Sequence, residues 1–176
     1  MRVRNWVFWT GTLAIAGLLV VPALTAAEAS GPAKGSTVPL LHVDAFNDND
    51  VEYCVTCRAG KMPTVVTLIT ADTAGARDAL VATDEAYRAG ADKNLKGAAI
   101  LVGTNDSTEG LRAFAAEKKL TIPVAVAAAD YKDIPSWKVN SKVAATVVLI
   151  RDRKIVDSLT DPDHQSVKSG VAALTN

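Results

Sequence analysis

Four short runs of almost unbroken apolar residues constrain the fold of this chain more than any other feature. They are PTVVTLIT (63–70), GAAILVG (97–103), PVAVAAA (123–129) and AATVVLI (144–150). A strand with one face in water alternates apolar and polar residues, whereas a strand covered on both faces is apolar throughout. The runs therefore predict central strands of a sheet that has a layer of structure on each side.

Segments with helical periodicity separate or follow these runs, at 73–89, 105–120 and 161–176. We expect Asp106 or Ser107 to cap the second segment, and Asp161 to cap the third with Pro162 at its first helical position. Apolar residues repeat at the spacing of one helix face, which predicts three helices lying on the sheet. These residues are Ala76, Leu80, Thr83 and Tyr87, then Leu111, Phe114 and Ala115, then Val167, Val171 and Leu174.

The remaining strand signals lie at the two ends of this pattern. VPLLHVDAF (38–46) predicts a short strand, and Pro39 favours an edge position because proline cannot donate to a ladder. Residues 146–150 and 154–158 predict an antiparallel hairpin around Asp152 and Arg153. Alternating strands and helices predict a mostly parallel sheet with right-handed crossovers, to which the hairpin adds an antiparallel pair. The predicted fold class is α/β.

The amino-terminal segment has the order of a secretory signal peptide. Arg2 and Arg4 precede an apolar run over 6–21, and a stretch of small residues follows. We predict a signal peptide over 1–29, a linker over 30–37 and one domain over 38–176. The alternative is a retained membrane anchor, since 6–24 approaches the roughly 20 residues that span a bilayer. The first interpretation predicts an exported protein, periplasmic or extracellular, with no membrane contact after cleavage.

Charge and cysteine content narrow the class of partners. The chain carries 19 Lys and Arg against 19 Asp and Glu. Binding to a phosphate backbone needs a clustered basic surface, which this balance does not suggest, so we expect no nucleic-acid partner. Its only cysteines are Cys54 and Cys57. Disulfides persist outside the cytoplasm, so we expect these two to be joined at rest.

The order of elements resembles the thioredoxin-like superfamily. The resemblance covers about 38–174 and includes CVTCRAGKMPTVVTLIT (54–70) and SWKVNSKVAATVVLIRDRKIV (136–156). It is nearest to exported bacterial thioredoxin-like proteins with a CxxCR segment before the central strand. The resemblance implies a three-layer sandwich, with a mixed central sheet flanked by helices.

The chain departs from that family where the chemistry usually lies. In an active thioredoxin the cysteine pair follows the central strand, but the matching turn here, TADTAGAR (70–77), contains no cysteine. Peroxiredoxins have a similar fold, and the cysteine that attacks peroxide in them lies at the same position after the central strand. Residues 143–146 stand where exchange proteins carry a cis-proline. Because Cys54 and Cys57 precede the strand, we expect them near its opposite end.

The cysteine pair has three interpretations. In the first, Cys54 and Cys57 exchange disulfides with exported protein thiols or disulfides, with Cys54 attacking and Cys57 resolving by analogy with motif order. Arg58 and Lys61 would then lower a thiolate pKa by proximity. In the second, the pair is a structural disulfide on a non-catalytic binding or scaffold module. Its ring is so short that it removes little chain entropy.

The third interpretation is a metal site, for which a CxxC pair supplies half of the ligands. His42, with Asp44 or His164, would have to complete it. Arg58 stands where haem attachment needs a histidine. We therefore expect no cofactor and no metal, and we expect both histidines to be ordinary surface residues. Trp137 is predicted to be a packing anchor.

Overall fold

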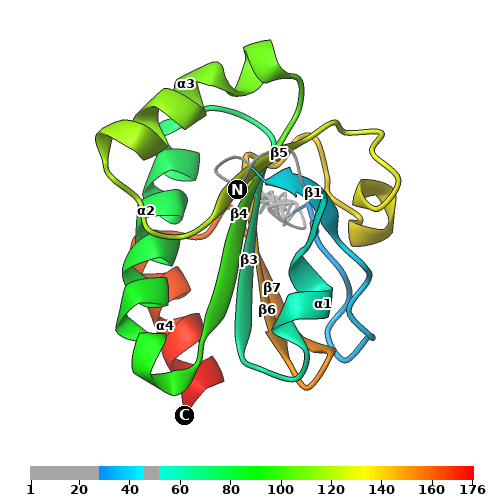
Figure 1. Ribbon diagram of the computed structural model, residues 1–176, viewed down its shortest axis with the longest axis vertical. Helices are drawn as coiled ribbons and strands as arrows, with labels where there is room; N and C mark the ends of the chain where they lie inside the picture. The colour runs from blue at the N-terminus through cyan, green and yellow to red at the C-terminus, as the bar shows by residue number, and fades with distance from the viewer. Residues whose placement is uncertain (1–27, 46–51) are drawn as a thin grey trace, which may run out of the picture.

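The computed structural model describes residues 28–45 and 52–176 (Figure 1). The signal peptide predicted over 1–29 lies outside this part except for Glu28 and Ala29, and it remains a prediction. No helix within the described ranges is both long enough and apolar enough to cross a membrane. In chain order the elements are β1 (His42–Ala45), β2 (Glu52–Cys54), α1 (Val55–Ala59), β3 (Thr64–Ile69), α2 (Ala74–Ala89), η1 (Ala91–Lys93), β4 (Lys96–Val102), α3 (Asn105–Glu117), β5 (Val124–Ala127), η2 (Ile134–Trp137), β6 (Ala145–Arg151), β7 (Lys154–Thr160) and α4 (His164–Thr175).

Seven strands of the described residues form one mixed sheet in the order β2-β1-β5-β4-β3-β6-β7. Strands β3, β4 and β5 are parallel, and β6 is antiparallel to both β3 and β7. The four predicted central strands and the predicted hairpin are therefore confirmed. Asp152 and Arg153 form the hairpin turn with φ of 53° and 61°. Two consecutive left-handed residues give a turn whose twist matches that of the strands.

The amino-terminal strand is not the edge strand that the sequence predicts. β1 pairs with β2 on one side and with β5 on the other. Pro39 lies before the strand begins, so its missing N–H removes no ladder hydrogen bond. The edge is instead β2, which has 3 residues. A strand that short shows no alternation from which it could be predicted.

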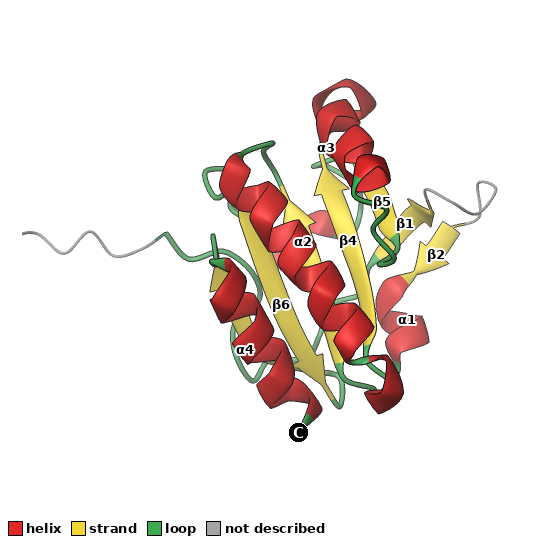
Figure 2. Ribbon diagram, turned by 90° about the vertical axis from the view of Figure 1, so that its left-hand side faces the viewer, coloured by secondary structure: helices red, strands yellow, loops and turns green. Residues whose placement is uncertain are grey.

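The helices are divided unequally between the two faces of the sheet (Figure 2). The long helices α2, α3 and α4 lie on one face, where they cover apolar side chains of β3, β4, β5 and β6. The short helices α1 and η2 lie on the other face and cover Val66, Ile100 and Val148 from the same strands. The three-layer arrangement is confirmed, with its second outer layer made mainly of short helices and irregular chain.

Two predicted helix starts are wrong by a few residues. The side chain of Thr104, rather than that of Asp106 or Ser107, caps α3 by accepting the N–H of Ser107 at 3.3 Å. Asp163, rather than Asp161, caps α4 by accepting the N–H of Ser166 at 2.7 Å. Asp161 instead accepts the N–H of Ala145 at 2.8 Å, which joins the end of β7 to the start of β6.

Residues 30–37, expected to be a linker, lie along the β6–β7 hairpin. The N–H of Gly35 donates to the carbonyl of Ile155 at 2.8 Å, and the N–H of Ile155 donates to that of Ser36 at 3.0 Å. The hydroxyl of Ser30 is buried, 2.6 Å from that of Thr146. This segment is therefore hydrogen-bonded to the domain along its length.

A buried carboxylate ties α2 to the chain that leads into β5. Asp84 is 1% exposed, and its Oδ1 accepts hydrogen bonds from the N–H groups of Thr121 and Ile122 at 2.6 and 2.9 Å. The guanidinium of Arg88 lies 3.0 Å from its Oδ2. Removing one side of such a contact leaves buried donors without a partner, which costs more than the hydrogen bond contributes.

We predict that Asp84→Ala lowers the free energy of unfolding by about 2–4 kcal/mol, because buried donors and the Arg88 charge lose their acceptor. Urea denaturation followed by circular dichroism measures this loss. The matched control is Asp92→Ala on the exposed turn η1, expected to change stability by less than about 0.5 kcal/mol. Equal effects of the two substitutions would contradict the structural role of Asp84.

Candidate functional site

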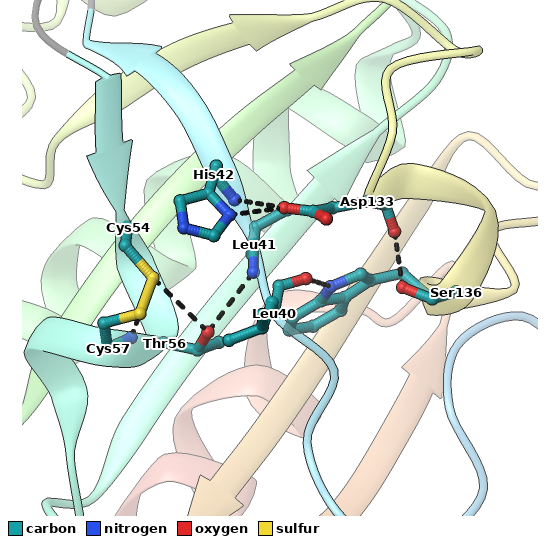
Figure 3. A network of polar contacts seen from close by, with 9 residues as sticks. Leu40, Leu41, His42, Cys54, Thr56, Cys57, Asp133 and Ser136 are labelled. Atoms are coloured by element: carbon teal, nitrogen blue, oxygen red, sulfur yellow. Dashed lines mark hydrogen bonds and ion pairs between the residues drawn. A yellow bond between two sulfur atoms is a disulfide. The ribbon is translucent and has the colours of Figure 1, made fainter.

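Cys54 and Cys57 form a disulfide where β2 passes into α1 (Figure 3). Cys54 is the last residue of β2 and also the cap of α1, because its Sγ accepts the N–H of Cys57 at 3.2 Å. The two cysteines differ in exposure: Cys57 is exposed, whereas Cys54 is half-buried. An incoming sulfur therefore has easier access to Cys57.

The imidazole of His42 lies beside the disulfide. His42 on β1 is the cross-strand partner of Cys54 on β2. Ligand atoms of His42, Cys54 and Cys57 all lie within 4.8 Å of one another. The ring places Nδ1 2.7 Å from Oδ2 of Asp133, and Figure 3 shows its other nitrogen on the side of the disulfide. Strand pairing thus brings a histidine and two cysteines together at the sheet edge.

Asp133 is held as a carboxylate. Burial acts to raise its pKa, but hydrogen bonds from the backbone N–H and the ring of His42 outweigh it, so the pKa of Asp133 lies below its usual value. Its Oδ2 accepts that backbone N–H at 2.8 Å. Because an ionised carboxylate only accepts hydrogen bonds, Nδ1 of His42 must carry the proton it shares with Asp133.

Buried side chains hold Asp133 in this position. Directly after it, η2 buries Ile134 and Trp137, and Trp137 is 0% exposed. The indole N–H of Trp137 donates to the carbonyl of Leu40 at 2.9 Å, two residues before His42 in the chain. The role predicted for Trp137, a packing anchor, is confirmed. Its contacts fix the η2 segment against the strand that carries His42.

Comparisons with family models and with curated proteins find no match for this chain. Solved structures do match. The thioredoxin domain of a thiol-disulfide oxidoreductase from Bacteroides vulgatus aligns with a TM-score of 0.64 at 18% identity, covering 82% of this chain and 99% of that one. A DsbF homologue from Corynebacterium diphtheriae aligns at 0.61 and 13%, covering 79% and 87%. Peroxidoxin BcpB from Mycobacterium tuberculosis aligns at 0.60 and 15%, covering 80% and 95%. The chain has a thioredoxin-like fold.

Within this thioredoxin-like fold, the cysteines do not lie at the end of the sheet that the sequence predicts. Asp44 pairs with Val126 in antiparallel register, so His42 and its partner Cys54 lie level with the carboxyl end of β5. They are displaced sideways, because β1 and β2 extend the sheet beyond β5. Helix α1 then packs against β4, and the chain returns to the amino end of β3 (Figure 1). The cysteines lie at this end because β2 pairs with β1, and β1 pairs with β5 in antiparallel register.

The usual thioredoxin-like corner, between β3 and α2, carries other groups. Thr73 caps α2 by accepting the N–H of Ala76 at 3.1 Å. Asp72 forms an ion pair with Arg77 at 2.6 Å, and the hydrogen bond from Arg77 lowers the pKa of Asp72. The absence of a thiol there is a property of the sequence. The corner therefore offers a solvated ion pair and no sulfur chemistry.

The remaining predicted site residues are placed as follows. Arg58 is exposed in the last turn of α1, and Lys61 is exposed just after it. The backbone of Asp44 lies in β1, while its side chain is outside the part described. His42 had been predicted to be an ordinary surface residue. Its pairing with Asp133 depends on residues far apart in the chain, so no local motif could have revealed it.

His164 lies away from the cysteines, on α4. Its Nδ1 is 3.2 Å from Asp78 and its Nε2 is 3.1 Å from Glu85, both on α2. The contact with Asp78, followed by that with Glu85, raises the pKa of His164. It does not join the cluster formed by His42 and the cysteines. His164 therefore links two helices and does not complete a metal site with the cysteines.

We predict that the stabilisation from His164 is fully present below pH 6.5, its ordinary pKa, and is lost as pH rises through the raised pKa of the folded state. The difference in unfolding free energy between the wild type and His164→Gln should thus be larger at pH 6 than at pH 8.5. Denaturation at both pH values measures it, and titration of the ring by NMR gives the pKa directly. A difference that grows with pH would contradict the contact.

Proposed function

We propose that this protein is exported and exchanges thiols and disulfides with other exported proteins through Cys54 and Cys57. The observation that carries the proposal is the position of the disulfide: Cys57 is exposed, and the pair lies beside an imidazole. A short ring contributes little to stability, so it opens and closes at small energetic cost. The fold, which solved thiol-disulfide oxidoreductases share, is compatible with this chemistry but does not require it.

The proposed exchange begins at Cys57. A thiolate of a dithiol substrate attacks Cys57 Sγ, the bond between the two cysteines breaks, and Cys54 Sγ leaves as a thiolate. The second substrate thiolate then attacks the substrate sulfur of the mixed disulfide, and Cys57 leaves. Two electrons pass to the protein, which ends as a dithiol while the substrate ends as a disulfide. The reverse sequence reduces a substrate disulfide.

The surroundings of Cys54 support its role as the leaving sulfur. Its Sγ accepts the N–H of Cys57, and a hydrogen bond to the charged form favours a thiolate. A ring nitrogen of His42 lies within 4.8 Å of this sulfur, and its lone pair can accept the proton of the Cys54 thiol in the reduced pair. Arg58 follows Cys57 directly in α1, so its positive charge is adjacent to the pair along the chain. This order, with Cys57 attacked and Cys54 released, is the reverse of the one expected from motif order.

We predict that Cys57 in the Cys54→Ser variant reacts at least about tenfold faster with an aromatic disulfide than Cys54 does in the Cys57→Ser variant. The exposed sulfur is easier to reach, and access is one determinant of exchange rate. Release of the coloured aromatic thiolate measures both rates. The two variants differ only in which sulfur remains, so each is the control for the other. A faster Cys54 would reverse the proposed roles.

We also predict that the Cys54–Cys57 couple has a reduction potential between about −120 and −270 mV, the range of working exchange proteins. Equilibration of the mature protein against glutathione, followed by trapping of free thiols, measures it. A value below roughly −300 mV, or thiols that cannot be trapped until the protein unfolds, would leave a structural disulfide on a binding or scaffold module.

Export rests on the leader predicted over residues 1–29. Cleavage after Ala29 leaves Ser30 as the first residue, with its hydroxyl buried against Thr146. Cleavage after Ala27 keeps Glu28, whose carboxylate lies 2.9 Å from Lys142. Amino-terminal sequencing of the exported protein is expected to give Glu28 or Ser30. A chain that begins at Met1 and stays with the membrane would favour the anchor instead.

A further inference from the structure

We propose that the reduced protein binds one Zn²⁺ ion through Cys54 Sγ, Cys57 Sγ and Nε2 of His42, with a water molecule as the fourth ligand. One ligand atom from each of these three residues already lies within 4.8 Å of the other two. Zinc bonds of about 2.0–2.3 Å require ligand atoms about 3.3–4 Å apart. Once the disulfide is opened, the sulfurs are free to separate to that spacing, and the imidazole has to approach by at most about 1.5 Å.

His42 is oriented as a metal ligand by its partner. A histidine that binds metal usually donates its other ring N–H to a carboxylate, which fixes the ring and its tautomer. Nδ1 of His42 lies 2.7 Å from Oδ2 of Asp133, so that nitrogen is the one held by the carboxylate. Nε2 is then left with its lone pair on the side of the disulfide (Figure 3). The ring needs no rearrangement of its hydrogen bond to bind an ion there.

His42 is held in place by hydrogen bonds to Asp133, and Asp133 is itself anchored by buried neighbours. Asp133 accepts both the backbone N–H and the ring of His42, and it is followed by the buried Ile134 and Trp137. On the other side, the hydroxyl of Thr56 in α1 accepts the N–H of Leu41 at 3.2 Å. These contacts join the segments that carry all three ligands. The backbone segments that carry the ligands are therefore held together before an ion arrives.

The ligand set and the exposure together favour Zn²⁺. Two thiolates select soft or borderline ions, and imidazole suits zinc. Three protein ligands of the Cys₂His type with a water in the fourth position form an established zinc geometry. Cys57 is exposed, so solvent reaches that fourth position. No second cysteine pair exists in the chain to close a four-sulfur site.

Binding is coupled to the redox state of the pair. A reductant such as a dithiol or a phosphine first supplies two electrons, and two protons enter from water, so the disulfide becomes two thiols. Zn²⁺ then displaces those protons, because metal ligands must be deprotonated. The disulfide form offers only His42 and does not bind. The ion holds the sulfurs as thiolates and shields them from exchange.

The test is a titration of the phosphine-reduced protein with Zn²⁺ under anaerobic conditions, in competition with a chromophoric chelator. We expect one equivalent bound per chain in the dithiol form and none in the disulfide form. His42→Gln should weaken binding at least about tenfold, and Asp133→Asn about 10–100-fold by loss of orientation. His164→Gln is the matched control, since it removes the other histidine of the chain, and it should leave the affinity unchanged.

Two results would overturn the proposal, provided that circular dichroism shows each variant folded. One is equal affinity of the wild type and His42→Gln, which would mean binding by the dithiol alone. The other is half an equivalent per chain, which would mean an ion shared between two copies. Co²⁺ gives an independent readout, because thiolate-to-cobalt absorption should appear in the wild type and vanish in Cys57→Ser. None of these readouts depends on exchange activity, so failure of the proposed function leaves the test intact.

Discussion

Burial of the central strands on both faces determines where the helices and the irregular segments of the described chain pack. Side chains of β3, β4 and β6 are covered by the long helices on one face and by α1, η2 and irregular chain on the other. On the second face, one residue joins the irregular parts: Trp137 is fully buried and its indole N–H binds the carbonyl of Leu40. This hydrogen bond holds η2 against the residues that lead into β1. The position of Asp133 beside His42 depends on the same packing.

The cysteine pair gains its chemical surroundings from the register between β1 and β2. Cys54 and His42 are directly paired residues, and directly paired side chains on adjacent antiparallel strands lie close together. The same imidazole serves both proposals, as proton acceptor during exchange and as a ligand for an ion bound by the reduced pair. The two exclude each other, because both need the same sulfurs. In the two proposals, the disulfide form takes part only in exchange, whereas the dithiol form either exchanges or holds the ion.

The sequence was sufficient for the fold because long apolar runs such as 63–70 and 144–150 leave little choice of structure. Helix stripes were equally clear, and Val167, Val171 and Leu174 are all buried. The site was less predictable. Its cysteines were found from their spacing, but β2 is a 3-residue strand with no pattern of its own. Asp133 is separated from His42 by 91 positions in the chain. Asp133 and His42 come together only in the folded protein, where Trp137 packs η2 against the chain before β1.

The hydrogen bonds between residues 30–37 and the hairpin also protect the sheet from growing. An exposed edge strand presents unpaired N–H and C=O groups that recruit strands from other molecules. At the β7 edge, Gly35 and Ser36 bond to both backbone groups of Ile155, and Thr37 forms a bridge with Lys154. At the other edge, β2 is so short that it offers little to pair with. Pairing with another molecule is thereby hindered where β7 begins, which is masked, and along β2, which is short.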